Sequence, residues 1–282
     1  MLNTLTVITT VKDFRQTRAG FDRVGCVPTM GYLHEGHLSL MRQARRECGT
    51  AAVSIFVNPT QFAPHEDFTR YPRDLERDLR LLAVEGVELV FVPEVGEMYP
   101  EGFGTAVVLP AADEVLEGAA RPDHFSGVAT VVCKLLNIVQ PTRAYFGQKD
   151  AQQTVVVRQM VRDLNMPTQI VVAPTVREAD GLAMSSRNSY LTPKQRAAAQ
   201  ILYRALTAAQ ELLASGERHG DGLRQAMSEV LADEPLARPE YVSVADPLTL
   251  RELAEVGPRG ALISLAVRVG VVRLIDNLLI DA

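Results

Sequence analysis

Cysteine is scarce in this sequence, and long apolar runs are missing from it. The 282 residues include 3 cysteines, an odd number without paired spacing. A disulfide framework or a zinc knuckle is therefore disfavoured, and a reducing compartment is expected. No segment approaches the roughly 18 uninterrupted apolar residues of a membrane span, and the first residues lack the basic and apolar stretches of a secretory signal. We expect a cytoplasmic protein with no membrane partner.

A basic excess is missing as well. Lysine and arginine number 29 against 34 aspartates and glutamates, which gives a formal net charge of −5. A dedicated nucleic-acid binder usually carries a basic excess, so we expect no nucleic-acid partner. The 47% hydrophobic and 22% charged residues are ordinary for a globular chain. The length fits one large domain or two modest ones, and a small-molecule function is the expectation that remains.

Short apolar runs alternate with helical patterns over the first two thirds of the chain. Between the runs, apolar residues recur three and four positions apart, as in the series 38, 41, 44, 48. This alternation predicts an α/β fold with a doubly wound parallel sheet, whose ligands bind beyond the carboxyl ends of the strands. The predicted strands lie at 24–27, 53–57, 87–92, 144–146 and 169–173.

The pattern changes after about residue 177. Thr192 and Pro193 predict the start of a long helix that runs to about residue 215. A glycine-rich break and a second helix at 223–232 follow, and then strand-like runs at 241–245, 261–267 and 271–275. We therefore predict a second, smaller α+β C-terminal domain, with domains over 1–176 and 177–282.

The first motif is the run PTMGYLHEGH at 28–37, which follows the first predicted strand and opens a strong helix. His34 and His37 would bring two imidazoles and several free amide N–H groups toward one point, which suits a polyphosphate. Gly36 lets a phosphate approach the backbone closely. The alternative is a capped surface helix with incidental histidines. We prefer the phosphate site because strand, His-x-Gly-His and helix form the HIGH-type pattern of adenylyl-transferring enzymes. A metal site is disfavoured, because no third ligand has suitable spacing.

Three further segments carry groups that could bind an anion or a small substrate. Gln61, in the run NPTQF, could hydrogen-bond a carboxylate or hydroxyl, or could belong to a plain Asn-Pro turn. Lys149, in the run GQKD, follows a strand and suits a phosphate, although a polar loop is the alternative. The run MSSR at 184–187 offers two hydroxyls and an arginine to a phosphate, or forms a Ser-rich hinge.

Two other segments are less decisive. The run RPDHFSG at 121–127 precedes an apolar helix, with Ser126 as a candidate N-cap. Arg121 and His124 could present a cation and a donor to an anion, or could form a structural loop. The run YPRDLERD at 71–78 predicts a solvated helix face of alternating charge, and its residues alone suggest no catalytic role.

Six motifs in order along the chain resemble those of the pantothenate synthetase (pantoate–β-alanine ligase) family, within the HIGH-motif nucleotidylyltransferase superfamily. The resemblance runs from about residue 24 to residue 191, and residues beyond it carry no motif that we can use. An ordered set of six motifs is far more specific than any single one. The motifs lie at 28–37, 54–62, 71–73, 121–128, 146–153 and 175–188.

The resemblance implies a Rossmann-like catalytic domain over 1–176 that binds ATP and pantoate, and a lid domain over 177–282. It implies that a pantoate carboxylate attacks the α-phosphate of ATP, which releases pyrophosphate and leaves pantoyl adenylate. The amine of β-alanine then attacks the activated carbonyl, which gives pantothenate and AMP. Mg²⁺ is expected on the polyphosphate, with Asp78 as a candidate contact, and the family suggests a homodimer.

The resemblance also assigns the site residues, with His37 as the proton donor to the phosphates. The implied catalytic residues are His34, His37, Lys149, Ser185, Ser186 and Arg187. The implied pantoate- and β-alanine-binding residues are Gln61 and Gln153. The implied ATP-binding residues are Met30, Gly31, Tyr32, Leu33, His34, Glu35, Gly36, His37, Gly147, Gln148, Lys149, Asp150, Val176, Met184, Ser185, Ser186 and Arg187.

Two alternatives stay open. One is a nucleotidylyltransferase of the same superfamily, which transfers AMP to a phosphate-bearing acceptor. The neutral amides of Gln61 and Gln153 fit pantoate better than such an acceptor. The other is a non-catalytic nucleotide-binding module, which predicts a basic surface that the net charge of −5 does not support.

Overall fold

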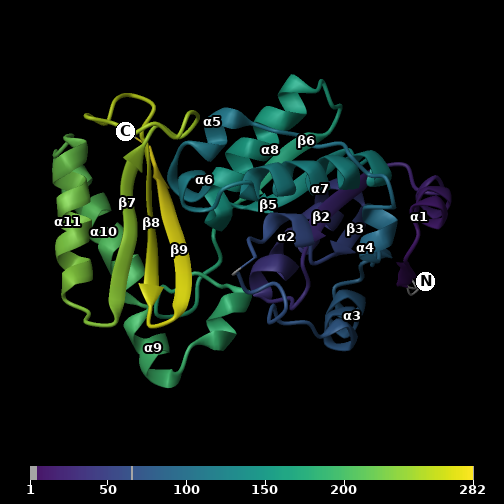
Figure 1. Cartoon of the computed structure of the whole chain (residues 1–282), viewed down its shortest axis with the longest axis horizontal. Helices are drawn as coiled ribbons and strands as arrows, with labels where there is room; N and C mark the ends of the chain where they lie inside the picture. The colour runs from purple at the N-terminus through teal and green to yellow at the C-terminus, as the bar shows by residue number, and fades with distance from the viewer. Residues whose placement is uncertain (1–4, 65, 282) are drawn as a thin grey trace. The chain divides into compact units, whose positions relative to one another are not determined.

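The computed structural model describes residues 5–64 and 66–281 (Figure 1). The chain forms two compact units. The first comprises Met1–Gly147 and Gln153–Pro174, and the second comprises Gln148–Gln152 and Thr175–Ala282. The short segment that carries Lys149 thus belongs with the second unit, while the domain division at residues 176 and 177 stays a prediction. Across the described ranges, no helix is both long and apolar enough to cross a bilayer.

The first unit is built on a six-stranded parallel sheet. In spatial order its strands are β1 (Thr6–Ile8), β4 (Leu89–Phe91), β3 (Thr50–Ile55), β2 (Val24–Thr29), β5 (Arg143–Gly147) and β6 (Gln169–Ala173). From β2 the chain adds β3 and β4 on one side, and later adds β5 and β6 on the other. The reversal between β2 and β5 is a topological switch point, where ligands bind in such folds. The predicted α/β, Rossmann-like, doubly wound sheet is confirmed.

Apolar side chains cover both faces of this sheet. The helices around it are α1 (Val11–Arg18), α2 (Glu35–Cys48), α3 (Leu75–Val84), α4 (Val95–Met98), α5 (Pro110–Asp113), α6 (Leu116–Ala120), α7 (His124–Val139) and α8 (Ala151–Asp163). Along β4, Leu89 and Phe91 belong to a buried cluster with α1, α7 and α8, whereas Val90 belongs to a cluster with α2 and α3. Strands buried on both faces in this way produce the nearly continuous apolar runs seen in the sequence.

The second unit contains a separate antiparallel sheet, in which β8 pairs with β7 on one side and β9 on the other. Its elements are the 3-10 helices η2 (Gln148–Asp150) and η3 (Ser186–Tyr190), the helices α9 (Pro193–Ala198), α10 (Ile201–Ala214) and α11 (Gly220–Ala232), and the strands β7 (Ala237–Ala245), β8 (Ala261–Val269) and β9 (Val272–Ile280). Figure 1 shows α10 and α11 beside the three strands. Leu206, Met227 and Ile263 are fully buried in the core between them. The predicted smaller α+β domain is confirmed as a fold.

Several strands differ from their predicted extents, among them β3, which spans Thr50–Ile55 and not 53–57, and β7, which begins at Ala237 and not at 241. The three-residue edge strand β1 is not predicted, because Thr6 and Val7 are exposed and only Ile8 is buried. The predicted strand at 271–275 continues to Ile280 as β9. Asp276 and Asn277 interrupt its apolar pattern in the sequence, yet both are buried in the structure.

The predicted long helix is also divided. Thr192 caps its N-terminus as expected, with a capping box that includes Gln195. The helix predicted from there to about residue 215 is, however, two helices, because α9 ends at Ala198 and α10 begins at Ile201. The residues between the two helices, Ala199 and Gln200, keep right-handed helical dihedral angles. The chain therefore passes from α9 to α10 without leaving the helical region of backbone conformation.

Candidate active site

The first motif forms a tight loop between β2 and α2. Gly31 has a φ of 82° and Tyr32 a φ of 51°, a left-handed conformation that glycine adopts without strain. Asp78, on α3, reaches this loop with its carboxylate. Asp78 Oδ2 accepts the Tyr32 amide at 2.7 Å, and Oδ1 accepts the Leu33 amide at 2.8 Å. The loop that leads into α2 is therefore held by a side chain from a distant part of the chain.

The two motif histidines lie together at the start of α2. His34 directly precedes the helix and His37 lies in its first turn, with ring centroids 4.0 Å apart. The His34 amide donates to His37 Nδ1 at 3.3 Å, so a neutral His37 carries its ring proton on Nε2. Both side chains are partly exposed. His37 therefore offers an N–H donor close to the first-turn amides and the positive end of the α2 dipole, which together attract anions.

Asp78 does not fit the expected Mg²⁺ contact. It is 1% exposed, and both of its oxygens accept backbone amides. Burial raises its pKa, opposed by the amides of Leu33 and Tyr32 and by Arg77, whose Nη1 lies 3.6 Å from Oδ1. Within the described part of the chain, no three His, Cys, Asp or Glu side chains are grouped so that they could hold a metal ion. The contacts of Asp78 instead make it a positioning group for the loop.

Gln61 lies beside the first motif. This agrees with the expectation that both belong to one site at the carboxyl edge of the sheet. It ends the 3-10 helix η1 (Pro59–Gln61), which follows β3. Its Nε2 donates to Met30 Sδ at 3.2 Å, and its Oε1 accepts Asn58 Nδ2 at 3.1 Å. Asn58 is 1% exposed and accepts the Tyr99 hydroxyl at 2.7 Å. The orientation of the Gln61 amide is thus set by a buried asparagine that the sequence interpretation did not assign to the site.

The segment 121–127 supports the backbone of Gln61. His124 Nδ1 donates to the Gln61 carbonyl at 2.8 Å, and Arg121 Nη2 donates to the same oxygen at 3.3 Å. Arg121 is paired with Glu66 at 2.7 Å, and its Nη1 lies 3.0 Å from His124 Nε2. Burial and the Arg121 charge lower the pKa of His124 to about 4. A neutral, hydrogen-bonded His124 agrees with the structural-loop alternative and not with a cation offered to an anion.

Glycine allows this support to come close. Gly127, in α7, faces the turn that ends at Gln61, and a Cβ there would lie 2.4 Å from the Thr60 carbonyl oxygen. The helix begins at His124 with Asp123 before it, so the predicted N-cap at Ser126 is wrong. α7 starts one turn earlier than the apolar pattern indicated, and this places Gly127 inside the helix and against the turn.

The second unit carries the other predicted phosphate-binding groups. Lys149 Nζ lies 3.4 Å from Asp150 Oδ1, and the Lys149 side chain is 19% exposed. The Met184 amide donates to the Val176 carbonyl at 3.0 Å, which closes a short hairpin. Ser185 then caps η3, because its Oγ accepts the Arg187 amide at 3.3 Å.

The predicted site residues are therefore divided between the two units. Met30 to His37, Gln61, Gly147 and Gln153 belong to the first unit, where Gln61 contacts Met30 and Gly147 ends β5 at the switch point. The second unit holds Gln148, Lys149, Asp150, Val176 and Met184 to Arg187. The structure adds groups that position these residues, a role that the sequence did not predict for them.

A doubly wound sheet whose switch-point loop places His-x-Gly-His at a helix N-terminus defines a nucleotide-binding α/β enzyme of the HIGH type. The family model described as pantoate-beta-alanine ligase matches residues 4–279. The chain belongs to the pantoate–β-alanine ligase family. The predicted family and its ligase class are thus confirmed, and this assignment decides against both the nucleotidylyltransferase and the non-catalytic nucleotide-binding module.

Named relatives agree with this assignment along the whole chain. A pantothenate synthetase of Chloroflexus aggregans is 70% identical over 274 residues, which cover 97% of this chain and 99% of the relative. A crystal structure of pantothenate synthetase from Thermus thermophilus has a TM-score of 0.94 and 50% identity, and covers 99% of this chain and 100% of that one. The pantoate-beta-alanine ligase of Francisella tularensis, complexed with beta-gamma ATP and beta-alanine, has a TM-score of 0.80 and 34% identity, with 98% of each chain covered.

Proposed function

We propose that this chain condenses pantoate with β-alanine in two steps at the carboxyl edge of the parallel sheet. In the first step a pantoate carboxylate oxygen attacks the α-phosphorus of ATP, and the bond to the β-phosphate breaks, so that pyrophosphate leaves. In the second step the β-alanine nitrogen attacks the acyl carbon, loses a proton and displaces AMP. The observation that carries the proposal is the His34–His37 pair at the N-terminus of α2, held at the switch point by Asp78.

The first step needs groups that stabilise negative charge on the phosphates. His37 serves this need, because its Nε2 carries the proton when Nδ1 accepts the His34 amide. Preorganised donors of this kind lower the barrier where charge develops in the transition state. His34 and the backbone of Met30 to Gly36 complete this part of the ATP site.

The family resemblance supports the remaining ATP-binding assignments. Lys149 and Arg187 are the proposed charge stabilisers, with Ser185 and Ser186 as supporting hydroxyl donors. The further proposed ATP-binding residues are Gly147, Gln148, Asp150, Val176 and Met184. In this proposal residues 1–176 form the catalytic domain, and residues 177–282 form the lid.

Gln61 and Gln153 are the proposed ligands of pantoate. The Gln61 amide has a property that suits this role. Its Oε1 is engaged by Asn58, whereas its Nε2 donates to the thioether of Met30, which is a weak acceptor. A carboxylate or hydroxyl oxygen of a substrate would be a stronger acceptor for that N–H. Substrate binding would therefore break only a weak hydrogen bond of the Gln61 amide.

Three further features belong to the same proposal. Mg²⁺ enters with the ATP phosphates, since the described residues supply no cluster for it. The enzyme acts in the cytoplasm, in keeping with three free cysteines. It forms a homodimer, supported by the exposed apolar side chain of Phe103, which lines a surface cavity of about 340 Å³. Light scattering of the purified protein should give about twice 30.9 kDa, and a mass equal to one chain would contradict the dimer.

The reaction is tested by measuring AMP with each substrate omitted in turn. AMP should form in step with pantothenate only when ATP, pantoate and β-alanine are all present. AMP release without consumption of β-alanine, or a preference for another amine, would exclude the ligase reaction.

The role of His37 is tested by the pyrophosphate burst of His37→Ala. The rate of this burst should fall by roughly two to four orders of magnitude, the usual scale for a proton-donating group. His219→Ala is the matched control, because His219 is exposed at the start of α11 and should keep the wild-type rate. A nearly wild-type burst in His37→Ala would refute the assignment.

A further inference from the structure

Two adjacent polar residues are almost completely buried on β9. Asp276 is 2% exposed and Asn277 is 3% exposed, in a strand that is otherwise largely apolar. Buried polar groups are costly unless they are hydrogen-bonded, and a buried charge is costlier still. The partners of these two side chains therefore indicate what the pair does.

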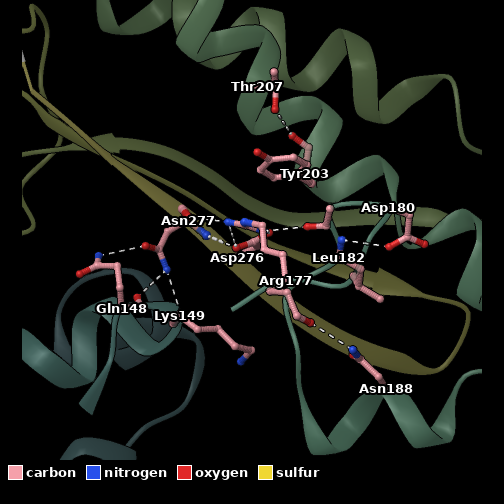
Figure 2. A network of polar contacts seen from close by, with 12 residues as sticks. Gln148, Lys149, Arg177, Asp180, Leu182, Asn188, Tyr203, Thr207, Asp276 and Asn277 are labelled. Carbon is pink, nitrogen blue, oxygen red and sulfur yellow. Dashed lines mark hydrogen bonds and ion pairs between the residues drawn. The ribbon is translucent and has the colours of Figure 1, made fainter. Parts of the chain in front are cut away.

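Asn277 directs its whole side-chain amide to the segment that carries Lys149. Its Nδ2 donates to the Gln148 carbonyl at 3.0 Å and to the Lys149 carbonyl at 2.8 Å. Its Oδ1 accepts Gln148 Nε2 at 3.0 Å. Figure 2 shows these bonds converging on Asn277 from the start of the segment, while the Lys149 side chain extends away from them. The backbone of Lys149 is thus attached to β9 by a single side chain.

Asp276 holds a second segment through Arg177. The guanidinium donates to Asp276 Oδ2 at 2.6 Å and to Oδ1 at 3.0 Å, a bidentate arrangement that is favourable for this kind of pair. Burial raises the pKa of Asp276, and Arg177 and Lys149 act in the opposite direction. Arg177 also donates to the Gly181 carbonyl at 3.0 Å and lies over the Tyr203 ring at 4.2 Å. Figure 2 shows Arg177 joined to Asp276 by dashed lines.

The segment anchored by Arg177 leads directly to the MSSR run. From Arg177 the chain turns back, so that the Met184 amide donates to the Val176 carbonyl. Asn188 Nδ2 donates to the Ala183 carbonyl at 3.1 Å. Ser185, Ser186 and Arg187 lie between the residues that make these two bonds, and so their backbone is fixed at both ends.

We infer that Asp276 and Asn277 form a positioning pair that fixes the backbones from which Lys149 and Arg187 reach ATP. The inference rests on the proposed ATP-binding roles of those two residues. Lysine has a flexible four-carbon stem, so the position of its ammonium group depends on where its backbone is held. A misplacement of about 1 Å in a catalytic site can cost about a hundredfold in rate. Neighbouring residues of one strand thereby set the spacing of two positive groups that come from separate segments.

The test is Asn277→Ala, which removes all three bonds to residues 148 and 149. We expect kcat/KM for ATP in the adenylation step to fall by about ten- to a hundredfold. Hydrogen exchange in the peptide 147–152 should become faster. Ser264→Ala is the matched control, since Ser264 faces Asn277 across the β8–β9 pair, is 5% exposed, and has a hydroxyl without a hydrogen bond among the described residues. This control should retain wild-type adenylation and exchange.

A second substitution separates positioning from folding. Asn277→Leu keeps nearly the same shape, adds no buried charge and makes none of the three bonds, and it should show the same direction of change if Asn277→Ala does not fold. The double variant Asn277→Ala/Lys149→Ala should be little slower than Lys149→Ala alone, because Asn277 acts through Lys149. Such non-additivity is not expected of a residue that only stabilises the fold.

The outcomes are distinguishable. If Lys149→Ala is fully active, the proposed role of Lys149 fails, and this inference fails with it. If Lys149→Ala is impaired but Asn277→Ala and Asn277→Leu adenylate at the wild-type rate, only the positioning role is overturned. An equal loss in Ser264→Ala would also overturn that role, because it would trace the effect to the sheet as a whole.

Discussion

Gly127→Ala should damage the enzyme even though it replaces a glycine inside a helix. A Cβ at this position would lie 2.4 Å from the Thr60 carbonyl oxygen, 2.6 Å from the Thr60 carbonyl carbon and 2.8 Å from the Gln61 nitrogen. Favourable contacts between such atoms begin near 3.5 Å, so a displacement of about 1 Å is required. All three atoms belong to the backbone, and no side-chain rotation can relieve the contact. Either α7 or the turn that ends at Gln61 must move.

Two effects on stability oppose each other in this variant. Alanine is favoured over glycine in a helix interior by about 1 kcal/mol. Overpacking costs about 1–3 kcal/mol, and movement of the turn weakens the bonds from Asn58 to the Gly127 carbonyl at 3.2 Å and from His124 to the Gln61 carbonyl at 2.8 Å, at about 1 kcal/mol each. These contributions predict a net loss of roughly 2–4 kcal/mol. A displacement of Gln61 by about 1 Å should lower the adenylation rate by about a hundredfold.

The assay is pyrophosphate release at varied pantoate and varied ATP, together with urea unfolding. The loss should fall on the pantoate dependence, since Gln61 is the proposed pantoate ligand. Gly96→Ala is the matched control, because Gly96 also lies in a helix and a Cβ there would meet nothing within 4 Å. Should Gly127→Ala prove as stable as Gly96→Ala, with normal use of pantoate, the contact between α7 and the turn would not position Gln61.

Asp78→Asn should lower the unfolding free energy by about 1–3 kcal/mol at pH 7 in urea titrations, because the new amide group cannot accept both the Tyr32 and Leu33 amides. It should slow adenylation as well, and unchanged values of both quantities would contradict a positioning role for Asp78. His124→Gln should flatten the dependence of stability on pH. The unfolded chain protonates His124 below about pH 6.5, whereas the folded chain resists protonation until about pH 4. The wild-type unfolding free energy should therefore fall by up to about 3 kcal/mol as the pH drops through this window, and an equally steep fall in the variant would exclude His124 as its source.

Much of the fold could be predicted because buried positions recur in the sequence as a regular pattern of apolar residues. Strands covered by helices on both faces read as continuous apolar runs, and β2, β5 and β6 lie within two residues of their predicted bounds. The pattern fails where an element is exposed or where its polar residues find internal partners. Two of the three residues of β1 are exposed. The second half of β9 is not predicted, because the polar pair Asp276 and Asn277 resembles the end of a strand in the sequence.

The candidate site divides in the same way. His34, His37 and Gly36 stand together in one motif, so their placement at a helix N-terminus could be predicted. Asp78 could not be placed, because a single carboxylate in a helix of alternating charge reads as part of a solvated face. Only the tertiary fold brings its carboxylate to the loop before α2 and removes it from water.

The positioning groups share one property that explains why the sequence did not reveal their role. Asp78 binds the amides of Tyr32 and Leu33, His124 binds the carbonyl of Gln61, and Asn277 binds the carbonyls of residues 148 and 149. Each of these side chains acts on backbone groups, which every non-proline residue carries. The partner's identity is therefore unconstrained by the bond, and no pair of residue types records the contact in the sequence. The groups that contact substrate can be predicted from their residue types, whereas the groups that position them can be identified only from the folded structure.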